Sequence, residues 1–403
     1  MKKNNLTAGF IVLIAAIFCF NYGFGEFDLA QLIPFGHNKP LDISEPLYTD
    51  TDTYETPSEQ STYKNTAFPE IKTERKFDFS KTITINTPEE FFDCLTEARN
   101  SLVTSINIKM TDYNDDDYNI HKLERGKYSL SAEGKSIGTI AYMTYTFNFS
   151  DSYAICRACE DETLIPALSE EQQLSIKKLY AIKELLIKDG MSDYEKELAL
   201  HDYIVKNFEY DTSAAEQDEI SDSSTSITCF LCEHKGVCEA YAYTFKALCS
   251  LCGLKCYVVS GKLDNVNHAW NIIELDGSFY HIDLTSDDPL PDIPQHCFYT
   301  YFNLTDAEIS KTHVYENAQY KCTNDKYNYF KYNGLIVTDY SSLYDLSAER
   351  LSRGYDTIVF KKSGYNLTTD NINDLLSGKG YTSYTITGDL SDPNADHEIT
   401  LKK

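Results

Sequence analysis

Three residues in the middle of the chain have the types and the order of a thiol-based catalytic site, and they are Cys238, His268 and Asp283. Cys238 opens the segment CEAYAYTFKALCSLC, in which apolar residues recur at helical spacing up to Gly253, a common helix terminator. We therefore expect Cys238 in the first turn of a helix. Unsatisfied N–H groups and the positive end of the helix dipole favour a thiolate there, and the thiolate is the nucleophilic form of cysteine.

His268 and Asp283 follow on two predicted β-strands. His268 stands at the start of the β pattern NHAWNIIEL, and Asp283 falls inside the next one, SFYHIDLT. An Asp-Gly dipeptide separates the two patterns and predicts a hairpin. Directly opposite side chains of a hairpin lie about 4.5–5.5 Å apart at Cβ, which is near enough for an imidazole to bond a carboxylate.

The chemistry of such a site gives each residue a role. His268 would take the proton of Cys238 and return it to the leaving amine, while Asp283 would orient the imidazole and balance its charge. The backbone N–H of Cys238 is the natural oxyanion donor, and Tyr210 is a candidate second donor. Each of the three types is more often structural than catalytic, so the inference depends on their combination. We predict no metal and no cofactor.

Two helices are expected before this constellation, in LSEEQQLSIKKLYAIKELLIKDG and in SDYEKELALHDYIVKNFEYD. Ser192, with Glu195 three residues later, predicts a capping box for the second helix. The acidic, Ser-rich segment 212–228 carries few residues that could pack, so we expect a surface loop.

The flanking regions show two similar β-α-β patterns. One runs through TITIN, PEEFFDCLTEARNSL and SINIKM, followed by the alternating IGTIAYMTYTFNFS. The other runs through LIVTDYSSLYDLSAERLSRGYDTIVFKK, followed by YTSYTITG. They indicate two related accessory α+β domains on either side of a central one.

The N-terminal residues have the pattern of an export segment. Lys2 and Lys3 precede an apolar run from Leu6 to Phe20, as in a signal peptide or a membrane anchor. The next part is rich in Thr, Ser, Pro, Glu and Tyr, and it reads as a disordered stalk or linker. The predicted division is 1–25 export segment or anchor, 26–80 stalk, 81–170 N-terminal accessory domain, 171–325 catalytic domain and 326–403 C-terminal accessory domain.

Composition excludes some functions and leaves others open. With 62 acidic and 36 basic residues the net charge is -26, so nucleic acid is an unsuitable partner. Twelve cysteines in an exported chain would ordinarily form disulfides. Three CxxC pairs, the first residues of which are Cys156, Cys229 and Cys249, could instead build a zinc-stabilised module, or be buried as small apolar residues.

Residues 175–315 resemble the transglutaminase-like superfamily, a branch of the papain-like folds, in particular its exported bacterial members. The resemblance rests on SDYEKELALHDYIVKNFEYD, GVCEAYAYTFKALCSLCGLKCYVVSG, NHAWNIIELDGSFYHIDLTSDDP and YFNLTDAEISKTH. It implies an α+β fold in which a helix-start cysteine packs on an antiparallel sheet, and it places the catalytic residues on Cys238, His268 and Asp283. Many relatives read D-x-T-W, whereas Ser286 stands in the Trp position here, which implies lost packing at the site wall.

The resemblance implies an exported cysteine enzyme that attacks peptide or protein amides and forms a thioester acyl-enzyme. The family contains cross-linking enzymes, peptidases, peptide deglycosylating enzymes and inactive members, so the choice between hydrolysis and transamidation stays open. The expected partner is a peptide or protein at the cell surface, and the expected location is extracellular, secreted or membrane-anchored. The alternative is a catalytically silent surface binding or scaffolding protein.

Overall fold

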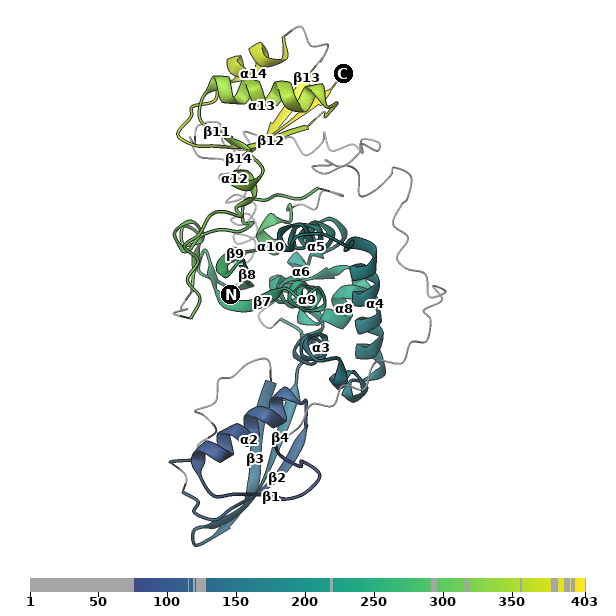
Figure 1. Ribbon diagram of the computed structural model, residues 1–403, viewed down its shortest axis with the longest axis vertical. Coiled ribbons are helices and arrows are strands. Elements are labelled where there is room, and N and C mark those ends of the chain that lie inside the picture. Colours follow the sequence, from purple (N-terminus) through teal and green to yellow (C-terminus); the bar gives the residue numbers. More distant parts are fainter. Residues whose placement is uncertain are drawn as a thin grey trace, which may run out of the picture. The chain divides into compact units, whose positions relative to one another are not determined.

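The computed structural model divides the chain into two compact units (Figure 1). It describes residues 76–114, 116–118, 120, 128–217, 220–290, 296–315, 319–355, 357–377, 383–387, 392 and 396–402. The first unit holds the described residues up to Gly277 together with Val314 and Tyr315, and the second holds the others. The predicted export segment and nearly all of the predicted stalk lie outside the described residues. Within that part of the chain, no helix is long and apolar enough to cross a membrane.

The first unit begins with a four-stranded sheet that carries one helix. Its elements are β1 (Ile83–Ile85), α2 (Pro88–Asn100), β2 (Ser105–Met110), β3 (Tyr128–Ile137) and β4 (Ile140–Phe149). The strand order is β1-β2-β4-β3, with β1 and β2 parallel and the other neighbours antiparallel. Phe91 and Leu95 of α2 are buried against Ile106 and Tyr145 of the sheet. The β-α-β order was predicted, but β3 was not, because its side chains are polar and mostly exposed.

A mainly helical region and a β-hairpin complete the first unit. Its elements are α3 (Asp151–Glu160), the 3-10 helix η3 (Glu162–Ala167), α4 (Glu170–Leu186), α5 (Asp193–Asn207), β5 (Glu209–Tyr210), α6 (Thr212–Ala215), α7 (Asp222–Thr225), α8 (Ile227–Glu233), β6 (Lys235–Gly236), α9 (Cys238–Leu251), β7 (Lys255–Leu263) and β8 (Val266–Leu275). The predicted helices α4, α5 and α9 are all present. The predicted capping box is also confirmed, since Ser192 accepts from the Glu195 N–H and Glu195 accepts from the Ser192 N–H.

The segment 212–228 lies largely at the surface, as predicted, but it is not a loop, because it contains α6, α7 and the start of α8. Its serines supply helix caps: Ser221 caps α7 and Ser226 caps α8. The carboxylate of Asp151 on α3 accepts from the hydroxyl of Ser226 at 2.7 Å and from the N–H of Thr228 at 3.0 Å. These bonds fix the end of the segment on α3, while most of its described residues up to Ser223 stay exposed.

The hairpin of β7 and β8 packs against α9. The two strands pair antiparallel from Lys255 with Glu274 to Leu263 with Val266. The side-chain amide of Asn271 on β8 donates to the backbone carbonyl of Ala242 on α9 at 2.9 Å. This bond fixes the helix along the strand that carries His268.

The second unit contains short elements followed by another four-stranded sheet. Its elements are β9 (Ser278–Ile282), α10 (Leu284–Asp287), α11 (Asp306–Ile309), β10 (His313–Val314, shared with the first unit), α12 (Tyr329–Tyr332), β11 (Ile336–Val337), α13 (Tyr340–Ser352), β12 (Thr357–Lys362), α14 (Thr369–Leu376), β13 (Ser383–Thr387) and β14 (Asp396–Lys402).

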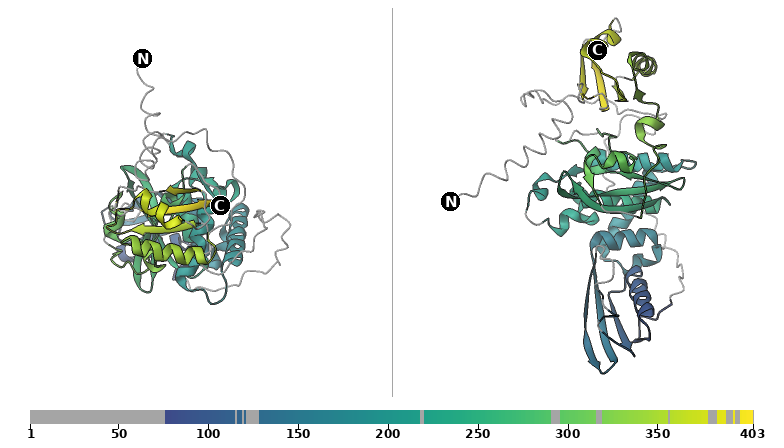
Figure 2. Two further views of the ribbon diagram at one scale, coloured as in Figure 1. Left: turned by 90° about the horizontal axis from the view of Figure 1, so that it is seen from above. Right: turned by 90° about the vertical axis from the view of Figure 1, so that its left-hand side faces the viewer.

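The last sheet repeats the design of the first one. Its order is β11-β12-β14-β13, its first pair is parallel, and a helix connects that pair. Figure 2 shows its strands in yellow with helices beside them. Val337, Leu343, Ile358 and Phe360 form its buried core. The predicted similarity of the two flanking patterns thus extends to strand order and direction, while α14 and β14 were not predicted. The five-part domain division stays a prediction.

Candidate active site

Cys238 is the first residue of α9, and the start of this helix differs from the others. Val237 is the N-cap residue, has an extended backbone and makes no side-chain capping bond. Every other helix of the described residues begins with a Ser, Thr, Asp or Asn whose side chain accepts from a first-turn N–H. The N–H groups at the start of α9 are thus not used by a side-chain cap, and Cys238 lies at the positive end of the helix dipole.

The backbone before Cys238 is held in place on both sides. The carbonyl of Gly236 accepts from the N–H of Asp211 at 2.8 Å, and the N–H of Val237 donates to the carbonyl of Ser224 at 3.1 Å. A Cβ at Gly236 would lie 2.7 Å from the Phe230 ring, so only glycine fits. Residues 235–236 also pair with residues 209–210, which puts Tyr210 opposite Gly236. A role for Tyr210 as an oxyanion donor stays a prediction.

The Cys238 side chain lies in a small buried cluster with Ala242 of α9 and Ala269 of β8. Ala269 directly follows His268, so the packing of α9 on β8 keeps the nucleophile candidate beside the strand of the base candidate. Cys238 is 7% exposed, so it is largely shielded from bulk water.

The other cysteines have the properties of structural residues. All eleven described cysteines are free thiols, so the disulfides expected for an exported chain are not formed among them. Burial raises the pKa of the Cys94 and Cys156 thiols to about 12 and that of Cys249 well above its usual range. Such thiols are poor nucleophiles at neutral pH. None of the described groups of possible metal ligands contains two cysteines, so the CxxC zinc alternative gains no support there.

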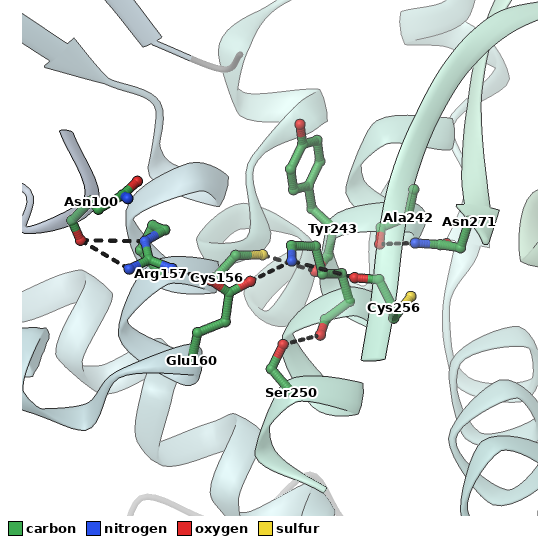
Figure 3. A network of polar contacts seen from close by, with 10 residues as sticks. Asn100, Cys156, Arg157, Glu160, Ala242, Tyr243, Ser250, Cys256 and Asn271 are labelled. Atoms are coloured by element: carbon green, nitrogen blue, oxygen red, sulfur yellow. Dashed lines mark hydrogen bonds and ion pairs between the residues drawn. The ribbon is translucent and has the colours of Figure 1, made fainter. Parts of the chain in front are cut away.

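A charged network anchors the middle of α9 (Figure 3). Arg157 of α3 donates to the backbone carbonyl of Asn100 at 3.0 Å and pairs with Glu160, which also pairs with Lys246 of α9. Lys246 reaches on to the carbonyl of Cys256 on β7 at 3.4 Å. Burial lowers the pKa of Lys246, but the nearby Cys156 and Glu160 outweigh burial, and the net pKa is raised. Lys246 therefore stays charged and ties α9 to α3 and β7.

His268 lies on β8 opposite Gly261 and is 8% exposed. Its ring stacks on Trp270, with centroids 5.9 Å apart and an interplanar angle of 19°. Trp270 is the only tryptophan of the chain, is buried, and meets Tyr315 edge-on at 5.6 Å. A Cβ at Gly261 would lie 2.8 Å from the indole, so this glycine makes room for it. The sequence prediction missed Trp270, although a single Trp two residues from a candidate base was a signal.

Asp283 is fully buried, but the prediction that it lies inside a strand was wrong. β9 ends at Ile282, and Asp283 is the N-cap residue of α10. Its Oδ1 accepts from the N–H groups of Thr285 at 3.1 Å and Ser286 at 3.3 Å. The strand ends here because the side chain competes for these N–H groups.

The second carboxylate oxygen of Asp283 has two further donors. The hydroxyl of Ser286 donates to Oδ2, and Nε2 of His313 lies 3.0 Å from the same oxygen. Ser286, which replaces the Trp of many relatives, is thus more than a lost packing residue, because it adds a hydrogen bond to the candidate orienting carboxylate. His313 is the last residue of the motif YFNLTDAEISKTH, but the sequence prediction gave it no role.

A second cluster in this unit contains His281, Asp306 and Cys322, whose potential ligand atoms all lie within 4.8 Å of one another. Nitrogen, oxygen and sulfur donors of this kind suit zinc. The same residues already bond one another: Oδ1 of Asp306 lies 3.0 Å from Nε2 of His281, and Oδ2 accepts from the backbone N–H of Cys322 at 3.1 Å. These bonds tie β9 to α11 and the following segment without any ion.

The structure places Cys238 and His268 on packed elements of the first unit and Asp283 with His313 in the second. The joint geometry of Cys238, His268 and Asp283 stays a prediction.

Comparison with known proteins identifies the class of the central domain. The model of the transglutaminase-like superfamily matches residues 181–284, a range that includes Cys238, His268 and Asp283. This part of the chain is a transglutaminase-like domain within a mixed α+β protein, as the motifs predicted.

The individual relatives cover only part of the chain. Kyphoscoliosis peptidase of Mus musculus is 30% identical over 134 residues, which are 29% of this chain and 19% of that protein. The Homo sapiens protein of the same name is 31% identical over 116 residues, which are 25% of this chain and 17% of that protein. The chain thus spans less than a fifth of the length of these relatives. A solved structure described as a TGase aligns over 51% of this chain and 59% of its own, at 17% identity and a TM-score of 0.26.

Proposed function

We propose that this protein is a cysteine acyl-transfer or amide-hydrolysing enzyme with Cys238 as its nucleophile. The observation that carries the proposal is the start of α9, where Cys238 occupies the first turn of the described helix that lacks a side-chain cap. The transglutaminase-like domain match and the resemblance to peptidases support an enzyme of this superfamily. The reaction itself is the proposed part.

In the proposed mechanism His268 accepts the proton of the Cys238 thiol, and the thiolate attacks an amide carbonyl. The tetrahedral oxyanion is stabilised by the backbone N–H of Cys238, which has no side-chain competitor at this helix start. His268 then protonates the leaving amine, which gives a thioester. Water or a second amine attacks the thioester and restores the thiol.

The proposed role of Asp283 is to orient His268 and to balance the imidazolium charge. Hydrogen bonds from two backbone N–H groups and from the Ser286 hydroxyl favour the ionised carboxylate over the neutral acid and offset the cost of its burial. The stacking of His268 on Trp270 supports the same role, because it limits the orientations that the imidazole can adopt.

The substrate class and the location are also proposals. We infer that the substrate is a peptide or protein amide at the cell surface, on the grounds of the export pattern of residues 1–25 and the peptidase resemblance. The alternative of a silent surface scaffold has one structural argument in its favour, because the low exposure of Cys238 and His268 leaves little surface for a substrate.

The test uses the reactivity of the thiol and needs no known substrate. The full chain is alkylated briefly with iodoacetamide at a series of pH values from 5 to 9. The labelling of each cysteine is then quantified by peptide mapping. We expect Cys238 to label faster than the exposed Cys232 at mildly acidic pH. His268→Ala should move Cys238 labelling to higher pH, whereas His296→Ala, a change at a half-buried histidine of the other unit, should not.

A second measurement decides between the two reactions. Acyl-enzyme is sought by mass spectrometry after incubation with glutamine-containing peptides, with Cys238→Ala as the control. Incorporation of a labelled primary amine would indicate transamidation, and release of free acid would indicate hydrolysis. Equal labelling of Cys238 and Cys232 at every pH, with no trapped thioester, would favour the scaffold alternative over an enzyme.

A further inference from the structure

We propose that His313 is a positioning residue that keeps Asp283 ionised and fixes the plane of its carboxylate. This inference rests on the proposed function, because it concerns the group that would orient His268. No role for His313 was predicted from the sequence, and the superfamily match ends at residue 284, before His313. The role of His313 is inferred from the hydrogen bonds that it makes in the second unit.

The contact between the two residues is buried and close. Nε2 of His313 lies 3.0 Å from Oδ2 of Asp283, and the two side chains are 0% and 1% exposed. An ionised carboxylate can only accept, so Nε2 must carry the proton of this bond. The hydroxyl of Thr312 lies 2.8 Å from Nδ1 of His313, where it can donate to the bare nitrogen of the neutral ring. The two partners thus select one tautomer of the imidazole.

The bond completes the environment of the carboxylate. Two backbone N–H groups reach Oδ1, while the Ser286 hydroxyl and His313 reach Oδ2. Donors of this kind favour the ionised form and resist rotation of the carboxylate. Because both sides of the group are held, its orientation is set before any contact with a catalytic imidazole forms.

Further groups of the same unit lie around this pair. Asp287 accepts from the N–H of Tyr301 at 2.9 Å, and the Tyr301 ring packs on His313 at 5.5 Å. Burial is the main cause that lowers the pKa of His281, and the nearby His313 lowers it further. His313 is therefore held between a carboxylate, a hydroxyl and an aromatic ring, and its ring has a defined position.

A matched pair in the same unit provides the control. His281 precedes Asp283 by two residues and lies 3.0 Å from Asp306, the same distance as in the His313–Asp283 pair. The Asp306 side chain is 33% exposed, whereas that of Asp283 is buried. The two pairs share their chemistry, but only one includes a candidate catalytic residue.

The experiment measures the pH profile of Cys238 alkylation, together with thermal unfolding, in His313→Phe, His313→Gln and His281→Phe. Phe keeps a ring but removes the donor, so we expect the acidic limb to move to higher pH and the rate at pH 6 to fall about tenfold, as expected for a lost bond to a charged group. Gln keeps an N–H near the position of Nε2 and should restore the rate to within about threefold. His281→Phe should lower the melting temperature and leave the profile unchanged.

Two outcomes would overturn the inference in distinguishable ways. If wild-type Cys238 labels selectively but His313→Phe keeps the wild-type profile, His313 has no positioning role and the proposed function stands. If wild-type Cys238 shows no selectivity, both fail. Should His313→Phe not fold, Thr312→Val provides the second variant: it removes the Nδ1 partner, and an unshifted profile there would also contradict the proposal.

Stability must be followed at each pH, because His281 makes the fold sensitive to acid. Burial lowers the pKa of His281 in the folded state below that in the unfolded chain. The unfolded chain then binds more protons as pH falls below about 6.5, so the free energy of unfolding decreases toward acid pH. A shift in the alkylation profile counts only where the variant remains folded.

Discussion

The starts of α5 and α9 show two ways of treating the same unsatisfied backbone groups. At α5, Ser192 and Glu195 satisfy each other's N–H groups in a capping box, and no reactive residue lies in the first turn. At α9, the side chain of Val237 offers no acceptor, and Cys238 follows it. A capped start stabilises the helix, whereas an uncapped start leaves its donors for a thiolate or an oxyanion. Among the described helices, the helix that starts with the candidate nucleophile therefore lacks the stabilisation that a side-chain cap provides.

The start of α10 is an intermediate case. Asp283 caps this short helix through two N–H groups, and it is also the candidate orienting carboxylate. One residue therefore combines the capping role that Ser192 has at α5 with a proposed role in catalysis. Substitutions at the three helix starts can separate stability from reactivity.

The largest effect is expected from Asp283→Asn. Asn is also a good N-cap, so α10 should keep its cap, but a neutral amide cannot balance the imidazolium and favours the wrong tautomer. We expect turnover to fall by about 10³- to 10⁴-fold. The amide would also face the Ser286 and His313 donors, so the free energy of unfolding should fall by about 1–3 kcal/mol. Turnover and thermal melting measure the two effects, and unchanged turnover would remove Asp283 from the mechanism.

A smaller effect on reactivity is expected from Val237→Thr. Thr has almost the shape of Val, and its hydroxyl can accept from an N–H of the first turn of α9. Competition for the helix start should slow Cys238 alkylation at mildly acidic pH about two- to fivefold, which matches the usual value of about 0.3–1 kcal/mol for a charge at a helix end. Val237→Ala, which adds no acceptor, is the matched control. If both variants label like wild type, the uncapped start does not activate the thiol.

The smallest effect on reactivity is expected from Ser192→Ala. It removes the cap of α5 and should lower the free energy of unfolding by about 1 kcal/mol, as read from denaturant or thermal unfolding. Cys238 alkylation should not change, since α5 carries no residue of the candidate site. A slower alkylation would mean that capping acts through general stability, and the contrast between the two helix starts would lose its meaning.

The sequence was most informative where a pattern was local. Helical periodicity and Gly253 predicted α9 and the position of Cys238, and the S-x-x-E pattern predicted the box at Ser192. Local patterns failed where exposure hid the period, as in β3, or where polar residues cap short helices, as in 212–228.

The bond between His313 and Asp283 could not be predicted in this way. The residues are 30 positions apart, and their meeting depends on how the chain returns after α11. No propensity or spacing rule encodes such a return. The position of Asp283 was also only approximate, because the competition between its side chain and the strand decides where β9 ends.

The charged network of Arg157, Glu160 and Lys246 has a consequence for folding cooperativity. It links the end of α2, the helix on the N-terminal sheet, to α3 and through α3 to α9 (Figure 3). Separating these elements would leave partly buried charges without their partners, which lowers stability. The N-terminal sheet and the helical region should therefore open together in hydrogen exchange and behave as one foldon.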